Sequence, residues 1–149
     1  MMRGKMKSLK QAGLAAIGAL ALIATPVMAD DMPEGDAAKG EKKFKACAAC
    51  HAVGEGAKHK VGPELNNLIG RQAGSLEDYK YSSAMTKMGE EGLVWTAEVL
   101  FEYLEKPRSF VKGTKMSYAG LRKPEDRANV ISYLEQFSDQ TETAEAPAE

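Results

Sequence analysis

Two cysteines and a histidine lie within five consecutive residues, Cys47-Ala48-Ala49-Cys50-His51, and they constrain the fold more than any other part of the chain. Cys47 and Cys50 are the only cysteines among 149 residues, so a scaffold of several disulfides is excluded. Their sulfurs are about one helical turn apart and can face the same edge of a flat molecule. His51 follows directly, where its imidazole can bind a metal ion beneath that edge. The pattern predicts a metal, redox or cofactor site.

Attachment of haem c fits this motif better than three alternatives. A thioredoxin-like redox pair belongs at the end of a strand in an alternating β/α chain, whereas this motif follows an expected helix. A zinc site needs two more ligands, and the other histidine, His59, is spaced too widely from His51. A structural disulfide leaves His51 without a role. Haem c uses both thiols and the imidazole in this order, so we expect one haem bound covalently through Cys47 and Cys50.

The first 29 residues predict export. A basic start without acidic residues precedes an apolar stretch at 14–24, and Ala29 ends a suitable cleavage site. The apolar stretch is shorter than the roughly 20 residues that span a bilayer. We therefore expect 1–29 to be a cleaved signal peptide and the mature protein to be periplasmic and not membrane-spanning.

Charge is distributed unevenly along the expected mature chain. Residues 30–149 contain 16 basic and 21 acidic residues, a net charge of −5, whereas the whole chain has −1. Acidic residues gather in a short segment at 30–35 and in a tail at 138–149 that we expect to be disordered. Residues 37–138 contain 16 basic and 13 acidic residues. The folded body is thus expected to be mildly basic with acidic ends.

Helix-start residues predict an all-α fold with long loops. Asp36, Ser82 and Thr96 are suitable N-caps, and Pro124 suits a first helical turn. The expected helices run from 37 into the cysteines, from 83 to 88, from 97 to Pro107, and from 124 to 137. Turn residues between 52 and 74 leave room for at most one short helix, near 64–69, and 108–123 reads as a loop. No alternating run typical of a strand is present.

A haem iron bound by His51 takes a second axial ligand unless that position stays open for catalysis. Met85 and Met88 lie in an expected helix, where core packing accounts for them. Helical packing does not account for Met116, which lies in a loop between two glycines and is the favoured ligand. The other candidates are Met32, the lysines and His59, which lies between two lysines in a loop.

Taken in order, these motifs resemble the class I cytochromes c, of the soluble bacterial type close to the mitochondrial proteins. The resemblance begins with residues 43–71 and continues through Tyr79-Lys80-Tyr81, Trp95, 102–107, Gly113-Thr114-Lys115-Met116 and Tyr133-Leu134. It implies a cytochrome c domain at 36–137. The implied fold has three main helices, one or two short helices and long loops around one haem c.

The resemblance also implies roles for individual residues. Cys47 and Cys50 would form the thioether links, and His51 and Met116 would be the axial ligands. The carbonyl of Pro63 would accept the other ring N–H of His51. A haem propionate would pair or hydrogen-bond with Arg71, Tyr81 and Trp95. The Met116 side of the pocket would be supported by Tyr103 and Thr114.

A glycine inside the first expected helix has an implied explanation as well. Gly40 costs that helix about 1 kcal/mol relative to alanine. The resemblance places Gly40 and Phe44 against Val130 and Tyr133, where the two terminal helices cross. A close helix crossing would account for the glycine.

An iron with both axial positions filled has no place for a substrate, so one-electron transfer is expected rather than an enzyme. The implied donor is a bc-type quinol–cytochrome c reductase, and the implied acceptor is a terminal oxidase, a reductase or a photosynthetic reaction centre. Docking is expected to use a basic surface, formed by Lys43, Lys45, Lys60, Arg108, Lys112 and Lys115. The alternatives are a dedicated donor to one periplasmic reductase, and a haem peroxidase or ligand sensor with a displaceable Met116. We expect a monomer that does not bind nucleic acid.

Overall fold

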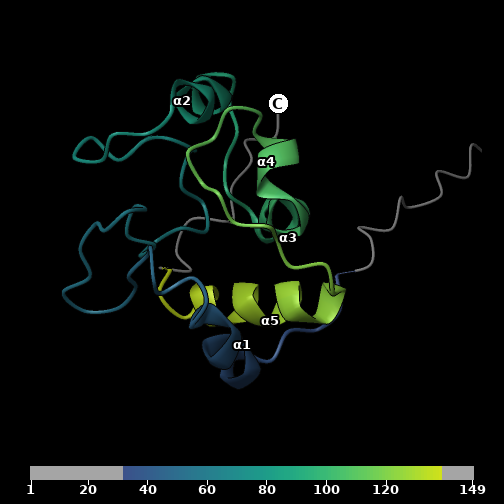
Figure 1. Cartoon of the computed structure of the whole chain (residues 1–149). Coiled ribbons are helices and arrows are strands. Elements are labelled where there is room, and N and C mark those ends of the chain that lie inside the picture. The colour runs from purple at the N-terminus through teal and green to yellow at the C-terminus, as the bar shows by residue number, and fades with distance from the viewer. Residues whose placement is uncertain (1–31, 139–149) are drawn as a thin grey trace, which may run out of the picture. The chain divides into compact units, whose positions relative to one another are not determined.

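The computed structural model describes residues 32–138, in which helices are joined by long loops (Figure 1). The helices of this part are α1 (Ala37–Phe44), α2 (Ser83–Glu90), α3 (Ala97–Glu105), α4 (Pro107–Phe110) and α5 (Pro124–Glu135). The only isolated β-bridge in the described range joins Gln72 and Val94. The expected all-α class is confirmed. The expected signal peptide and the tail from 139 lie outside the described residues.

The predicted helix starts are confirmed by their caps. Asp36, Ser82 and Thr96 each accept, through a side-chain oxygen, the backbone N–H three residues later, at 3.0, 3.1 and 3.2 Å. Each cap satisfies an N–H that has no partner inside the helix. Pro124 begins α5, where no N–H donor is needed. None of the described helices is long and apolar enough to cross a bilayer.

Three loop segments differ from the prediction. α1 ends at Phe44, and the cysteines lie in turns beyond it. Residues 64–69 form turns rather than a helix, because Asn67 takes a positive φ of 52° and the Asn66 side chain bonds to Gly54 across the loop. The expected loop after Pro107 begins with α4, because a proline that ends one helix also suits the first turn of the next.

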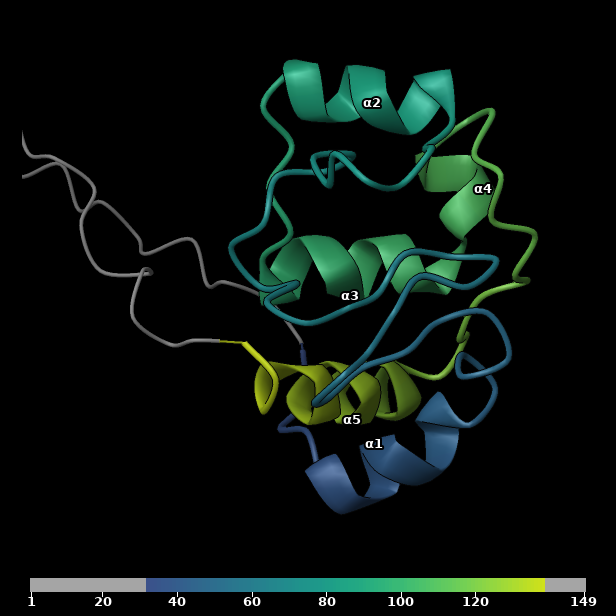
Figure 2. The ribbon, with the colours of Figure 1, turned by 90° about the vertical axis from the view of Figure 1, so that its left-hand side faces the viewer.

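The terminal helices α1 and α5 cross at one end of the domain (Figure 2). A Cβ on Gly40 would overlap the backbone carbonyl of Asn129 and lie 2.8 Å from the Cβ of Tyr133. Beside this contact, the rings of Phe44 and Tyr133 pack with centroids 5.3 Å apart. The helices therefore cross at Gly40 as expected, but Asn129 rather than Val130 faces the glycine.

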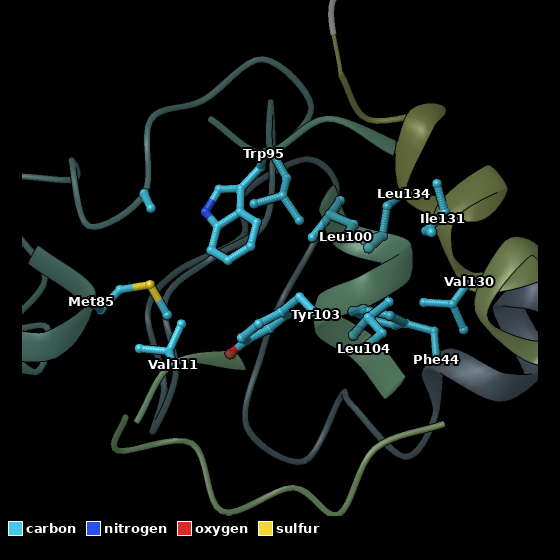
Figure 3. Close-up of a cluster of buried hydrophobic side chains, with 12 residues drawn as sticks. Phe44, Met85, Trp95, Leu100, Tyr103, Leu104, Val111, Val130, Ile131 and Leu134 are labelled. Atoms are coloured by element: carbon cyan, nitrogen blue, oxygen red, sulfur yellow. The ribbon is translucent and has the colours of Figure 1, made fainter. Parts of the chain in front are cut away.

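The buried core extends from this crossing to α2. Residues of α5 occupy one end of the core, and Met85, Trp95, Tyr103 and Val111 lie toward the other (Figure 3). The rings of Trp95 and Tyr103 are 4.9 Å apart. Beyond α5, Ser138 is buried and its hydroxyl accepts the N–H of Ile69 at 3.2 Å, so the folded part includes residue 138.

Candidate functional site

Residues 45–51, here called the attachment turn, fold back on the end of α1. The N–H groups of Cys47 and Ala48 bond to the carbonyl of Phe44 at 2.7 and 2.9 Å. Those of Cys50 and His51 bond to the carbonyl of Cys47 at 3.0 and 2.9 Å. Both thiols are free; burial raises the pKa of the Cys47 thiol, and nearby Cys50 adds to that rise. The attachment turn thus presents two unbonded thiols and one imidazole from a compact backbone.

The imidazole of His51 is oriented by a single backbone carbonyl. Its Nδ1 lies 2.7 Å from the oxygen of Pro63. Because a carbonyl only accepts, Nδ1 carries the proton and Nε2 keeps its lone pair. Burial lowers the pKa of His51, the bond to Pro63 opposes this, and the charges of Arg71 and Lys60 lower it further. A neutral imidazole with a free Nε2 is the form that binds iron.

Gly62 provides the space that this ring occupies. A Cβ at Gly62 would lie 2.7 Å from Nδ1 and 2.8 Å from Nε2 of His51 and would overlap the carbon between them. Any larger residue would push the imidazole away from Pro63. Two free thiols, an oriented neutral imidazole and a glycine-lined place for the ring together fit the donor set of haem c.

Met116 lies in the loop that follows α4, and its sulfur accepts a hydrogen bond from the hydroxyl of Tyr103 at 3.0 Å. The backbone N–H of Met116 donates to the hydroxyl of Thr114 at 3.2 Å. Burial raises the pKa of Tyr103 to about 12, although Thr114 opposes the rise, so the phenol stays protonated and can donate. The structure therefore brings Tyr103, Thr114 and Met116 together.

A second group of expected pocket residues surrounds Arg71. The backbone N–H of Trp95 donates to the backbone carbonyl of Arg71 at 2.9 Å. Burial raises the pKa of Tyr81, and the positive charge of Arg71 opposes that rise. The side chain of Arg71 is only 12% exposed. Trp95 thus meets Arg71 through the backbone, and the largely buried charge of Arg71 acts on Tyr81.

Sequence reasoning did not single out the residues that hold this guanidinium. Glu64 accepts from it through a carboxylate oxygen at 3.4 Å and through its backbone carbonyl at 3.2 Å. The carbonyl of Asn66 accepts at 3.1 Å. A carboxylate seven positions before an arginine is visible in the sequence, but an irregular loop has no period that would bring the two together.

The other candidate ligands have different surroundings. His59 is bonded at both ring nitrogens, to the Asp78 carboxylate at 2.9 Å and to the N–H of Glu64 at 3.0 Å. Met85 belongs to the buried core, against which Met32 and Met88 pack. In the range 32–138, no group of three or more His, Cys, Asp or Glu side chains is arranged to hold a metal ion, as a zinc site would require.

Comparisons with known proteins agree with this geometry. The family model for cytochrome c matches residues 37–138. The chain is 58% identical to a cytochrome c2 of Agrobacterium tumefaciens (strain II Chrys) over 101 residues, which cover 68% of this chain and 91% of the relative. It is 50% identical to a cytochrome c-550 of Ancylobacter novellus, covering 68% and 94% of the two chains. The solved structure of cytochrome c2 from Rhodospirillum centenum superposes with a TM-score of 0.68 at 41% identity, covering 70% of this chain and all of that one.

Proposed function

The chain belongs to the cytochrome c family, and on that premise we propose that it transfers single electrons between membrane complexes in the periplasm. It carries covalently bound haem c and is an electron carrier rather than an enzyme. When bound, the haem supplies an iron that gains and loses one electron. We assign its two thioether bonds to Cys47 and Cys50 of the attachment turn.

The observation that carries the proposal is the way His51 and Met116 are held. Pro63 fixes one nitrogen of His51 and leaves the other with its lone pair. Tyr103 uses one of the two lone pairs on the Met116 sulfur and leaves the second for a metal. Two oriented side chains with one free lone pair each suit the two axial positions of an iron. An iron held by both side chains would have no place for a substrate, which favours electron transfer over catalysis at the metal.

The interior around this pair supports a charged cofactor edge. Arg71 is the positive charge that would face a haem propionate, and Glu64 and Asn66 hold it in place before any cofactor binds. Tyr81 and Trp95 would add hydrogen-bond donors to the same carboxylate. A cation fixed in advance stabilises a buried carboxylate without reorganisation of the protein.

We assign docking to the basic surface. Some of its six side chains already bond to other groups of the chain, and others do not. Lys43 pairs with Asp126 at 3.0 Å, and Lys60 and Lys115 donate to backbone carbonyls at 2.8 and 3.0 Å. Among the described residues, Lys45, Arg108 and Lys112 are exposed and their side chains make no hydrogen bond or ion pair. These three are free to meet carboxylates of a partner. A bc-type reductase is the proposed donor, and an oxidase, reductase or photosynthetic centre is the proposed acceptor.

The decisive experiment is the absorption spectrum of the oxidised, haem-loaded protein. Sulfur ligation gives a weak far-red band, which Met116→Ala should abolish while lowering the reduction potential, because a thioether favours the reduced iron. Met85→Ala is the matched control, since it removes a methionine from the core instead. A band that survives Met116→Ala and disappears in Met85→Ala would refute the assignment.

The same samples separate the carrier from the alternatives. A carrier with both axial positions filled binds neither carbon monoxide nor peroxide at neutral pH. Rapid binding of either to the unmodified protein would instead support the peroxidase or the ligand sensor. Electron-transfer rates with several membrane complexes, compared with one purified periplasmic reductase, distinguish a general carrier from a dedicated donor.

A further inference from the structure

We propose that Lys60 is a positioning residue that holds the attachment turn, and with it His51, through the backbone carbonyl of Ala48. The inference rests on the proposed ligation by His51. It concerns a lysine that the sequence suggested only as one charge of a docking surface. The geometry gives it a second, internal role.

One short segment, residues 60–63, contacts the attachment turn at three points. The ammonium of Lys60 donates to the carbonyl of Ala48 at 2.8 Å. The N–H of Gly62 donates to the carbonyl of Cys50 at 2.8 Å, and Pro63 bonds to His51 as described. Each contact reaches a different residue of the motif, so the segment acts as a template for the backbone that presents the thiols and the imidazole.

The carbonyl of Ala48 accepts no backbone N–H in the described part of the chain. α1 ends at Phe44, and residues 45–50 form turns whose backbone hydrogen bonds leave this carbonyl to another donor. A lysine is well suited to this position, since its long side chain can donate to a backbone carbonyl while the charge stays near solvent. The ammonium therefore satisfies a carbonyl that lies between the two cysteines.

Lys60 is itself held in place for this contact. Its backbone N–H donates to the carbonyl of Gly62 at 2.9 Å and closes the loop before Pro63. The Lys60 side chain therefore extends from a backbone that is already bonded to Gly62, the residue against which the His51 ring packs. Loss of the ammonium should loosen Cys50 and His51 and weaken the bond between His51 and Pro63.

Of the three groups that residues 60–63 contribute to these contacts, only the ammonium of Lys60 belongs to a side chain, so only this one can be removed without altering the backbone of the segment. Lys60→Met keeps the length and removes the donor. Lys60→Arg keeps a donor that can reach the same carbonyl. Lys58→Met removes one positive charge from the same loop, where Lys58 is exposed and makes no side-chain hydrogen bond among the described residues. It is the matched control for charge.

The first measurement is amide hydrogen exchange in the haem-loaded protein. We expect the N–H groups of Cys50, His51 and Gly62 to exchange about 3- to 10-fold faster in Lys60→Met, the range for loss of one hydrogen bond. Lys58→Met should leave them unchanged, and Lys60→Arg should restore most of the protection. Equal rates in Lys60→Met and Lys58→Met would overturn the proposal. So would faster exchange spread evenly over α3 and α5, since that indicates general destabilisation.

The second measurement is the reduction potential, which a merely structural contact would not change. A weaker bond from His51 to Pro63 makes the imidazole a poorer donor, so the potential of Lys60→Met should lie above that of Lys58→Met. Identical potentials in these two variants would contradict the proposal. If His51 were not an iron ligand, the absorption bands that report the ligands would differ from the expected ones in the unmodified protein and in all the variants alike. That result is distinguishable from a failure of the Lys60 proposal.

Discussion

Replacing Gly40 by alanine tests the close backbone contact between α1 and α5. Helix propensity alone predicts a gain of about 1 kcal/mol in the free energy of unfolding, because alanine suits a helix interior better than glycine. The tertiary contact predicts the opposite. The new Cβ would overlap the Asn129 carbonyl oxygen and lie 2.6 Å from its carbon and 2.8 Å from the Cβ of Tyr133. Two of these atoms are backbone of α5, so the helices would have to separate.

Separation of α1 and α5 weakens two neighbouring contacts. One is the hydrogen bond from the N–H of Asp36 to the Asn129 side chain at 2.7 Å, and the other is the packing of Phe44 on Tyr133. Overpacking and the two weakened contacts cost about 3 to 5 kcal/mol. After the gain in propensity, we expect a net loss of about 2 to 4 kcal/mol.

Guanidinium unfolding of the oxidised, haem-loaded protein, followed by circular dichroism, measures this loss directly. Ala38→Gly is the matched control, because Ala38 is an exposed residue of the same helix and has only its propensity to lose, about 1 kcal/mol. A Gly40→Ala protein as stable as the unmodified one, or more stable, would refute the close crossing and leave propensity as the only effect.

Two further predictions concern charge. Lys112→Glu should slow electron transfer with a bc-type complex several-fold at low ionic strength, and the difference should vanish at high salt. Lys42 is exposed but lies outside the basic surface, so Lys42→Glu is the control. An equal effect from the two variants would argue against localised docking. The hydrogen bond to His59 lowers the pKa of Asp78 below its ordinary value of 3.8. The ionised Asp78 therefore stabilises the fold above pH 3.8, and this stabilisation is lost as the pH falls through the lowered pKa. Unfolding titrations of the unmodified protein and Asp78→Asn should therefore converge in acid, and a constant difference at all pH values would contradict this link.

Local chemistry explains why the helix starts could be read from the sequence. The caps at Asp36, Ser82 and Thr96 depend on the next three residues only, so their prediction needs no tertiary structure. The same local rule failed at Pro107, because proline suits both the end of one helix and the beginning of another. Propensity could not reveal the left-handed backbone of Asn67, which replaces the expected short helix with turns.

In the site, too, local patterns could be predicted from the sequence and tertiary contacts could not. The order of Cys47, Cys50 and His51 predicted the cofactor, because the attachment chemistry acts within a few residues of the chain. The bond between Lys60 and Ala48 could not be predicted, since a lysine among other lysines has no pattern that distinguishes an internal donor from a docking charge. The same holds for Glu64 and Arg71, which meet only because an irregular loop folds back on itself.

By itself, the sequence determined that the chain carries haem c, where most helices begin, and that the chain belongs among helical electron carriers. Each of these follows from residues close together in the chain or from a resemblance carried by short motifs. Only the tertiary structure decided that Lys60 donates to the carbonyl of Ala48, that the hydroxyl of Ser138 accepts the N–H of Ile69, and that Lys115 donates to the carbonyl of Lys80. Such contacts join loops that are distant in sequence, and their geometry depends on how those loops pack rather than on any local preference.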